Sequence, residues 1–292
     1  MRNLAGGFDR WKDEVIPFSI PRVLDADARA RYARHLKMPE VGVAGQLRLL
    51  DSRVLVVGAG GLGSPAALYL AAAGVGTLGI LDHDLVDRSN LQRQILHADE
   101  RVGGAKVESA VQAIRALNPS IRVVGHEVRL ASGNVEEILG GYDLVVDGSD
   151  NFPTRYLIND ACVKLAIPNV HGAVYRFEGQ VTVFWPGYEK QPGPCYRCLY
   201  PAPPPPEMAP SCAEAGVLGV LPWVIGMLEA VEAIKIILGA GDPLVGRMLH
   251  YDALPARFTE LQLERDLGCR YCADPAHFPG YVDYEAFCAA AA

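Results

Sequence analysis

The most constraining feature of this sequence is a glycine-rich turn that directly follows a short apolar run. Residues 54–57 are V-L-V-V, and Gly58, Gly60 and Gly63 follow at once in G-x-G-x-x-G spacing. Such a run is typical of a buried parallel strand. Glycines let the chain turn tightly and let a phosphate approach the backbone amides at the start of the next helix, which we expect over residues 64–73.

An acidic residue lies where a turn of this kind can use it. A second strand, predicted at residues 77–81, leads into Asp82, 24 positions after Gly58. A carboxylate at about this distance can accept hydrogen bonds from a pair of ribose hydroxyls. The alternative is that the glycines serve only a turn. Because strand, helix and acid occur in the expected order, we predict a nucleotide site. The fingerprint is usually typical of NAD binding, and the G-x-x-x-x-G-K-[ST] phosphate loop is absent from the sequence.

The order of the predicted elements indicates an α/β fold. Strands and helices alternate as far as about residue 170, which predicts a Rossmann-like, mostly parallel sheet with helices on both faces, extended by a C-terminal antiparallel β portion. Residues 186–210 are rich in proline, so we expect an extended crossing segment and not a helix. We expect residues 275–292 to be a weakly specified tail. The predicted helices are 28–35, 43–50, 64–73, 106–117, 134–139, 156–166 and 222–238, and the predicted strands are 54–57, 77–81, 121–128, 142–147, 167–172, 180–185, 247–251 and 258–263.

Composition and charge exclude several classes of partner. The 292-residue chain has a net charge of −7, so it has no basic excess to meet the phosphates of a nucleic acid. Residues 1–18 are charged throughout and lack the apolar centre of a secretory signal. The uncharged run 64–81 is interrupted by glycines and fits a helix plus a strand, not a membrane span. We therefore expect a cytoplasmic protein without membrane contact, whose seven cysteines are reduced.

Four of the cysteines form two pairs with metal-ligand spacing. Cys195 and Cys198 make one C-x-x-C pair, and Cys269 and Cys272 make the other, with 70 residues between the pairs. Four thiolates from two such turns predict a closed, tetrahedral and therefore structural zinc site. It would join the proline-rich crossing to the C-terminal part of the chain. The alternatives are a redox pair, which is normally found at a helix start, or free thiols.

The segment 82–94 is polar and lacks periodicity, so we predict a loop at the carboxyl end of the second strand, the edge where ligands bind in open α/β sheets. Arg93 and, further on, Lys106 could pair with phosphates, although either alone could equally be a solvated surface charge. The polar side chains that this loop offers to a ligand are Asp84, Asn90, Arg93 and Gln94.

A second acidic loop, D-G-S-D-N, follows the strand predicted to end at Asp147. Asp150 in this loop could bind Mg²⁺ that carries a nucleotide's phosphates, because magnesium takes one or two carboxylates together with phosphate oxygens. The alternative is that Asp150 caps the helix predicted at 156–166. Cys212 belongs to neither C-x-x-C pair and could be a small buried apolar residue.

Taken together, these motifs resemble the MoeB/ThiF family over residues 30–272. The resemblance rests on G-A-G-G-L-G with Asp82, S-N-L-Q-R-Q, K-V-E-S at Lys106, D-x-x-D-N-x-x-x-R ending at Arg155, E-G-Q-V-T-V-F, both C-x-x-C pairs, and S-C-A-E-A-G-V around Cys212. Members of this family activate ubiquitin-like sulfur-carrier proteins and are related to ubiquitin-activating enzymes. The resemblance implies a homodimeric adenylation domain that binds ATP with Mg²⁺, not NAD, and a carrier partner with a Gly-Gly tail.

The resemblance also implies roles for single residues. Arg34 would reach the ATP of the other protomer, and Cys212 matches a cysteine that can be linked to the carrier. The catalytic set implied is Arg34, Arg93, Lys106, Asp150 and Cys212. The nucleotide and its metal would be held by Gly58, Gly60, Gly61, Gly63, Asp82, Asp84, Asn90, Arg93, Gln94, Lys106, Asp150 and Asn151.

The same comparison divides the chain into an N-terminal extension (1–27), an adenylation domain with the zinc site (28–275) and a tail (276–292). No rhodanese-like domain follows the tail, so we expect a separate protein to donate sulfur. We expect residues 186–210 to form a wall of the groove for the carrier's tail. The sequence does not distinguish carriers for molybdopterin, thiamine, tRNA thiolation or cysteine synthesis.

Two other classes of function compete with adenylation. An NAD-dependent oxidoreductase would need a hydride-handling His or a Tyr–Lys pair opposite the nicotinamide, and no spacing in the sequence supports one. A zinc-stapled, catalytically silent scaffold is the second alternative, and the intact Asp150, Arg93 and Lys106 count against it.

Overall fold

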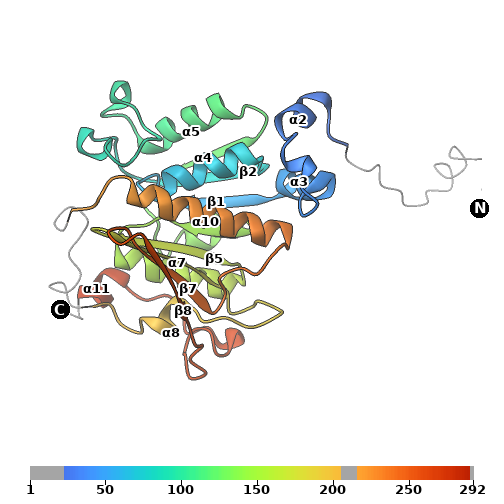
Figure 1. Cartoon of the computed structure of the whole chain (residues 1–292). Helices are drawn as coiled ribbons and strands as arrows, with labels where there is room; N and C mark the ends of the chain where they lie inside the picture. The colour runs from blue at the N-terminus through green and yellow to red at the C-terminus, as the bar shows by residue number, and fades with distance from the viewer. Residues whose placement is uncertain (1–22, 205–215, 290–292) are drawn as a thin grey trace, which may run out of the picture.

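The computed structural model describes residues 23–204 and 216–289, and its centre is one eight-stranded sheet in the order β3-β2-β1-β4-β5-β6-β7-β8 (Figure 1). The pairings among β1 to β5 are parallel and those from β5 to β8 are antiparallel, which confirms the predicted α/β class. The strands are β1 Arg53–Val57, β2 Thr77–Asp82, β3 Arg122–Glu127, β4 Leu144–Asp147, β5 Asn169–Tyr175, β6 Glu178–Phe184, β7 Arg247–Asp252 and β8 Arg257–Gln262.

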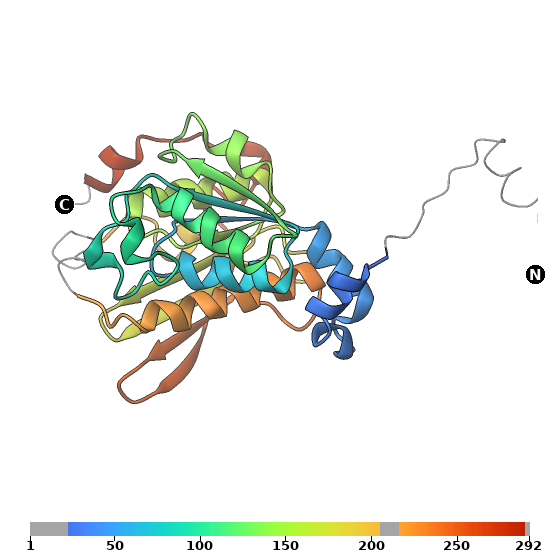
Figure 2. The ribbon, with the colours of Figure 1, turned by 90° about the horizontal axis from the view of Figure 1, so that it is seen from above.

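Helices cover both faces of the parallel part. Two of them, α4 and α10, lie side by side on one face, and the β7–β8 hairpin projects from the body (Figure 2). The helices are α2 Ala26–Arg31, η1 His35–Lys37, α3 Gly42–Asp51, α4 Gly63–Ala73, η2 Arg88–Asn90, η3 Asp99–Arg101, α5 Lys106–Leu117, α6 Val135–Leu139, α7 Phe152–Leu165, α8 Tyr196–Leu199, α10 Leu221–Leu238, η5 Pro275–His277 and α11 Tyr284–Ala289. None of the helices in these ranges is long and apolar enough to cross a membrane.

The run V-L-V-V is buried on both sides because successive side chains of β1 point to opposite faces of the sheet. Val54 and Val56 pack into a core formed with α4, α5 and α10, and Leu55 and Val57 pack into a second core formed with α6, α7 and α11. Each such side chain contributes about 1.5–3 kcal/mol when fully buried. Two helical layers around a continuous apolar strand therefore fix the position of the turn that follows it.

That turn depends on two glycines. Gly58 has φ +91°, a conformation that L side chains rarely adopt. A Cβ on Gly63 would lie 1.7 Å from the carbonyl oxygen of Gly58, so only glycine lets α4 begin this close to the end of β1. The third glycine of the fingerprint thus meets a packing requirement.

The start of α7 differs from the prediction of 156–166. The helix begins at Phe152 because the Asn151 side chain accepts a hydrogen bond from the Thr154 amide (3.0 Å) and Pro153 lies in the first turn. Asn151 is therefore the N-cap, and the alternative capping role for Asp150 is wrong.

The expectation that the crossing segment contains no helix is also wrong in one place. Residues 196–199 form the single turn α8, which begins after Cys195. The Tyr196 amide donates to the Asn159 side chain (2.7 Å), and the Tyr196 ring is buried. Tertiary contacts to α7 therefore outweigh the surrounding prolines, and residues 205–210 of the crossing lie outside the described ranges.

The C-terminal tail is better specified than the sequence indicated. Its helix α11 packs on α7, where the Tyr284 hydroxyl donates to Asp160 (2.7 Å) and the Phe287 ring meets the Tyr156 ring edge-on. The Arg197 guanidinium donates to both oxygens of the same aspartate (2.7 and 2.8 Å). A buried carboxylate shared by three elements thus anchors the tail, although the limits proposed for the domains stay predictions.

Candidate functional site

A pocket opens at the carboxyl ends of β1, β2 and β4 and contains about 930 Å³ of empty space, solvent opening included. The structure brings ten of the twelve predicted nucleotide residues to its lining. These are Gly58, Gly60, Gly61, Asp82, Asp84, Arg93, Gln94, Lys106, Asp150 and Asn151.

Three of the predicted residues do not line the pocket. Gly63 serves packing, as described above, and Asn90 is absent from the lining of the pocket. Arg34 is exposed and absent from the lining of the pocket, and it follows Tyr32, which packs on Gly74 just after the end of α4. It is therefore not in its own chain's pocket, and its role toward a partner stays a prediction. Cys212 lies outside the described residues.

Asp82 fixes the glycine-rich turn from the neighbouring strand. One carboxylate oxygen accepts from the Ala59 amide (2.8 Å), and the other accepts from the Asp84 amide (2.9 Å). A carboxylate oxygen accepts more than one hydrogen bond, so both oxygens keep capacity for a ligand that enters the pocket. The residue predicted to hold a ribose therefore also shapes the loop under it.

His97 holds the same turn from the other side and was not predicted. Its Nε2 donates to the Ala59 carbonyl (2.8 Å), because a carbonyl can only accept, and its Nδ1 accepts from the Ser109 hydroxyl (2.8 Å). Burial lowers the pKa of His97 below its usual value, which agrees with this neutral tautomer. No local motif marks this histidine, since its partners are 12 and 38 residues away.

Lys106 is the first residue of α5 and is almost fully buried. A cation is disfavoured at a helix N-terminus by the helix dipole, so its placement there indicates a specific partner. Its Nζ donates to Asp84 (2.7 Å). Burial raises the pKa of Asp84, but the hydrogen bond and charge of Lys106 outweigh burial and leave it lowered. The pair faces the pocket, where an anionic ligand could exchange with the carboxylate.

Further cations line the pocket besides Lys106 and the predicted Arg93. Arg129 follows β3 and pairs with Glu285 of α11, and Arg155 of α7 donates to the Ser149 carbonyl (3.2 Å). The sequence motif included Arg155, but no role was assigned to it. For Arg129 the sequence signal is its position just after β3, at the carboxyl edge of the sheet.

The loop that carries Asp150 depends on a buried carboxylate. Asp147 accepts at one oxygen from the Ser149 hydroxyl (2.5 Å) and amide (3.1 Å), and at the other from His171 Nδ1 (2.8 Å). Burial raises the pKa of Asp147, but its bond to His171 outweighs burial and leaves it lowered, whereas burial lowers the pKa of His171. Asp150 itself is exposed at the rim of the pocket.

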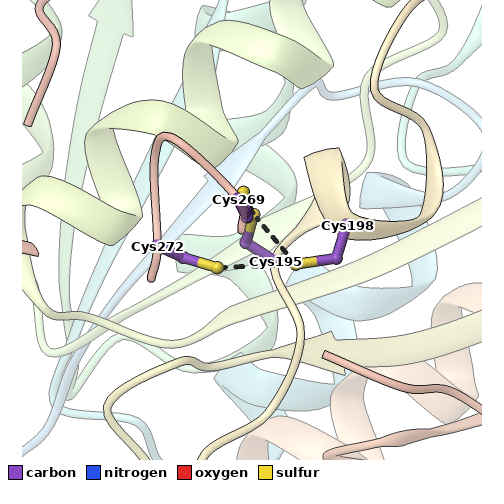
Figure 3. A group of neighbouring side chains, drawn as sticks. All are labelled: Cys195, Cys198, Cys269 and Cys272. Carbon is purple, nitrogen blue, oxygen red and sulfur yellow. Dashed lines mark hydrogen bonds between the residues drawn. The ribbon is translucent and has the colours of Figure 1, made fainter. Parts of the chain in front are cut away.

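The four predicted metal cysteines converge in one cluster (Figure 3). The sulfur–sulfur distances are 3.8 Å between Cys195 and Cys198, 3.7 Å between Cys195 and Cys269, and 3.4 Å between Cys198 and Cys272. A tetrahedron with Zn–S bonds of about 2.3 Å has edges of about 3.8 Å. The cluster therefore fits zinc. Cys195 lies at the start of α8, the position that is normal for a redox pair, but the convergence of four sulfurs favours a metal.

A model of the ThiF family matches residues 32–271 of the chain. The chain belongs to the ThiF family. The resemblance that the motifs predicted is thus confirmed over more than half of the sequence.

Two relatives and one solved structure place this ThiF-family chain more closely. It is 55% identical over 259 residues to the sulfur carrier protein adenylyltransferase of Thermus thermophilus, covering 88% of this chain and 96% of that one. It is 53% identical over 251 residues to the SAMP-activating enzyme E1 of Haloferax volcanii, covering 86% and 91%. The crystal structure of Escherichia coli MccB with ATP has the same fold, with a TM-score of 0.71 at 20% identity, covering 92% of this chain and 80% of that one.

The neutral His97 makes stability depend on pH. The unfolded chain takes up a proton on this histidine as the pH falls through about 6.5, while the folded chain does not, so stability is lost below that value. We expect the drop in unfolding free energy between about pH 7 and pH 5 to be smaller in His97→Gln, whose amide can still donate to Ala59. Urea unfolding at several pH values measures it. The exposed His277→Gln should keep the wild-type slope, and an unchanged slope in His97→Gln would contradict the assignment.

Proposed function

We propose that this chain is an ATP-dependent adenylyltransferase that activates the C-terminal glycine carboxylate of a ubiquitin-like sulfur-carrier protein. One observation carries the proposal: a glycine-rich turn, four cations and an exposed aspartate line a single pocket. The activity named for the Thermus thermophilus relative, which this chain matches almost end to end, supports it.

In this proposal ATP lies with its phosphates over Gly60 and Gly61, where the start of α4 favours negative charge. Asp82 accepts from the ribose hydroxyls. A carboxylate oxygen of the carrier's terminal glycine attacks the α-phosphorus, the bond from that phosphorus to its bridging oxygen breaks, and pyrophosphate leaves. Such a transfer asks the protein to align two anions and to neutralise charge, and it needs no obligatory general base.

The cations of the pocket suit that task. Lys106 has three donors, so it can keep its bond to Asp84 while another proton turns to a phosphate oxygen. Arg93 is half exposed and also lines the pocket, where its side chain lies beside Gly61. Asp150 offers a single exposed carboxylate, which fits Mg²⁺ held between protein and phosphates. Bound there, the ion would neutralise phosphate charge.

The four-cysteine cluster takes structural zinc in this proposal. None of its cysteines lines the pocket. The metal would join α8 to the turn at 269–272, next to Arg197 and its bidentate bond to Asp160. Binding energy at such a site adds directly to folding energy, because the unfolded chain does not hold the metal.

The partners proposed are a carrier with a Gly-Gly tail, a second copy of this chain and a separate sulfur donor, all in the cytoplasm. None of the described residues 186–204 lines the pocket, so we place the carrier's tail elsewhere than the predicted wall. Val174, Val217 and Pro222 form an apolar side of the lining that suits two glycines. The lining contains no Tyr–Lys pair, which disfavours the oxidoreductase alternative.

The reaction is tested by exchange of labelled pyrophosphate into ATP in the presence of a purified carrier that ends in Gly-Gly. We expect Asp150→Ala to lose about a hundredfold or more in exchange rate, the scale on which a single charge-stabilising group acts. Its thermal stability should be unchanged because Asp150 is exposed. The exposed Asp99→Ala is the matched control. Near wild-type exchange in Asp150→Ala would show that the metal assignment is wrong.

The zinc assignment predicts one zinc per chain by elemental analysis. Cys269→Ser removes a thiolate from the cluster and should lower both the zinc content and the thermal midpoint. Cys288→Ser changes a half-buried cysteine outside the cluster and should keep the zinc. A zinc-free wild-type protein of full stability would refute the site.

The shared active site predicts how much activity mixed dimers of two inactive variants recover. If Arg34 serves the partner's ATP, homodimers of Arg34→Ala and of Asp150→Ala are both nearly inactive. In a mixed dimer one site collects both defects and the other collects neither. After refolding equal amounts together, roughly one quarter of wild-type exchange should return under random pairing. Mixed dimers without recovered activity would mean that Arg34 acts in its own chain or not at all.

A further inference from the structure

The loop that carries Asp150 is anchored on β5 through a residue, His171, that does not line the pocket. Asp147 at the end of β4 lies beside His171 of β5 in the parallel register, and their side chains meet at 2.8 Å. The other oxygen of Asp147 accepts from the amide and hydroxyl of Ser149, the residue before Asp150. A continuous chain of hydrogen bonds thus runs from β5 to the pocket rim.

The buried position of His171 is energetically unfavourable for a side chain whose only role would be packing. Its side chain is 1% exposed, and its ring is packed between Phe184 and Tyr196, with centroids 5.5 and 5.3 Å away. Its Nε2 has no hydrogen-bond partner among the described residues. An unpaired buried nitrogen is unfavourable, and an apolar side chain of similar size would avoid it. The one polar interaction that offsets this cost is the bond to Asp147.

The turn that Asp147 holds also contacts the glycine-rich turn. The Gly148 amide donates to the Val57 carbonyl (2.9 Å), and a Cβ on Gly148 would lie 2.9 Å from the Gly63 nitrogen. The space for this turn is therefore narrow. A shift of the Asp147 carboxylate would move Ser149 and Asp150 relative to the phosphate-binding turn.

We propose that His171 is a positioning residue: through Asp147 and Ser149 it fixes the Asp150 carboxylate at the distance that a metal–nucleotide complex requires. This inference rests on the proposed function, because it assigns Asp150 to the metal. It adds a residue of β5, outside the pocket lining, to the set that determines metal affinity. His171 donates its Nδ1 proton and does not contact the ligand.

Two substitutions at this position separate the hydrogen bond from the packing. In His171→Asn the amide nitrogen can take the place of Nδ1, because both atoms are bonded to Cγ, so the donor is kept. In His171→Leu a side chain of similar bulk lacks the donor. Ser149→Ala removes the hydroxyl that donates to Asp147 and leaves the hydrogen bond between His171 and Asp147 in place. If His171→Leu does not fold, Ser149→Ala takes its place in the test.

Three measurements test the series of hydrogen bonds that runs from His171 through Asp147 to Ser149. We expect His171→Leu to raise the Mg²⁺ concentration for half-maximal pyrophosphate exchange about tenfold, equal to about 1.4 kcal/mol. His171→Asn should stay near wild type, and Ser149→Ala should show an intermediate shift. Mn²⁺ binding to the enzyme with ATP, measured by electron paramagnetic resonance, should weaken in the same order. Without ligands, hydrogen exchange of the Ser149 amide should be faster in His171→Leu than in His171→Asn.

Val170→Ala is the control for lost stability. Val170 precedes His171, but its side chain packs in the core on the opposite face of the sheet. If this variant loses as much stability as His171→Leu and shifts the Mg²⁺ dependence equally, the effect is only structural and the inference is overturned. It is also overturned if folded His171→Leu, or Ser149→Ala in its place, keeps wild-type metal dependence. A wild-type protein without carrier-dependent exchange refutes the proposed function instead, and the amide measurement still tests the positioning.

Discussion

The hydrogen bond from the Ala59 amide to Asp82 is the interaction on which the shape of the pocket depends. It joins the turn after β1 to the end of β2, and His97 holds the carbonyl of the same Ala59 from the opposite side. Both backbone groups of one residue are therefore fixed by buried side chains. Gly58 supplies the positive φ that makes this geometry possible. A glycine-rich turn held in this way is already ordered without a ligand, so a ligand that binds there does not bear the cost of ordering it.

The sequence predicted those parts of the site that depend on strand ends. Apolar runs identify strands, and polar residues that directly follow them must gather at one edge of a parallel sheet, which is why Asp82, Asp84 and Asp150 were found together. His97 and His171 could not be found in this way, because each acts through a partner on another element. The start of α7 was predicted four residues too late, although Asn151 as N-cap and Pro153 in the first turn are the local signals that mark it.

Net charge describes the chain and not the pocket. The chain carries −7 overall, yet four cations line one edge of its sheet: Arg93, Lys106, Arg129 and Arg155. Local placement decides which ligand is attracted, since exposed charges beyond about 10 Å are screened at ordinary ionic strength. An acidic protein can therefore concentrate positive potential where a triphosphate is to lie. Lys106 shows the cost, because it lies at the unfavourable end of a helix and needs Asp84 beside it.

The four-cysteine cluster and the pocket lie in different parts of the fold. Arg197, between two of the clustered cysteines, is held by Asp160 and lies over the Tyr271 ring at 4.0 Å. Burial raises the pKa of Asp160, and the Arg197 and Tyr284 hydrogen bonds oppose that rise. Loss of any one partner would leave a buried charge or hydroxyl unpaired, so the α8 turn, α7 and the tail are stable only together. The cysteine cluster belongs to this frame, whereas the pocket is set by β1, β2, β4 and, through His171, β5. The two networks meet where the Tyr196 ring of α8 packs against the His171 ring of β5.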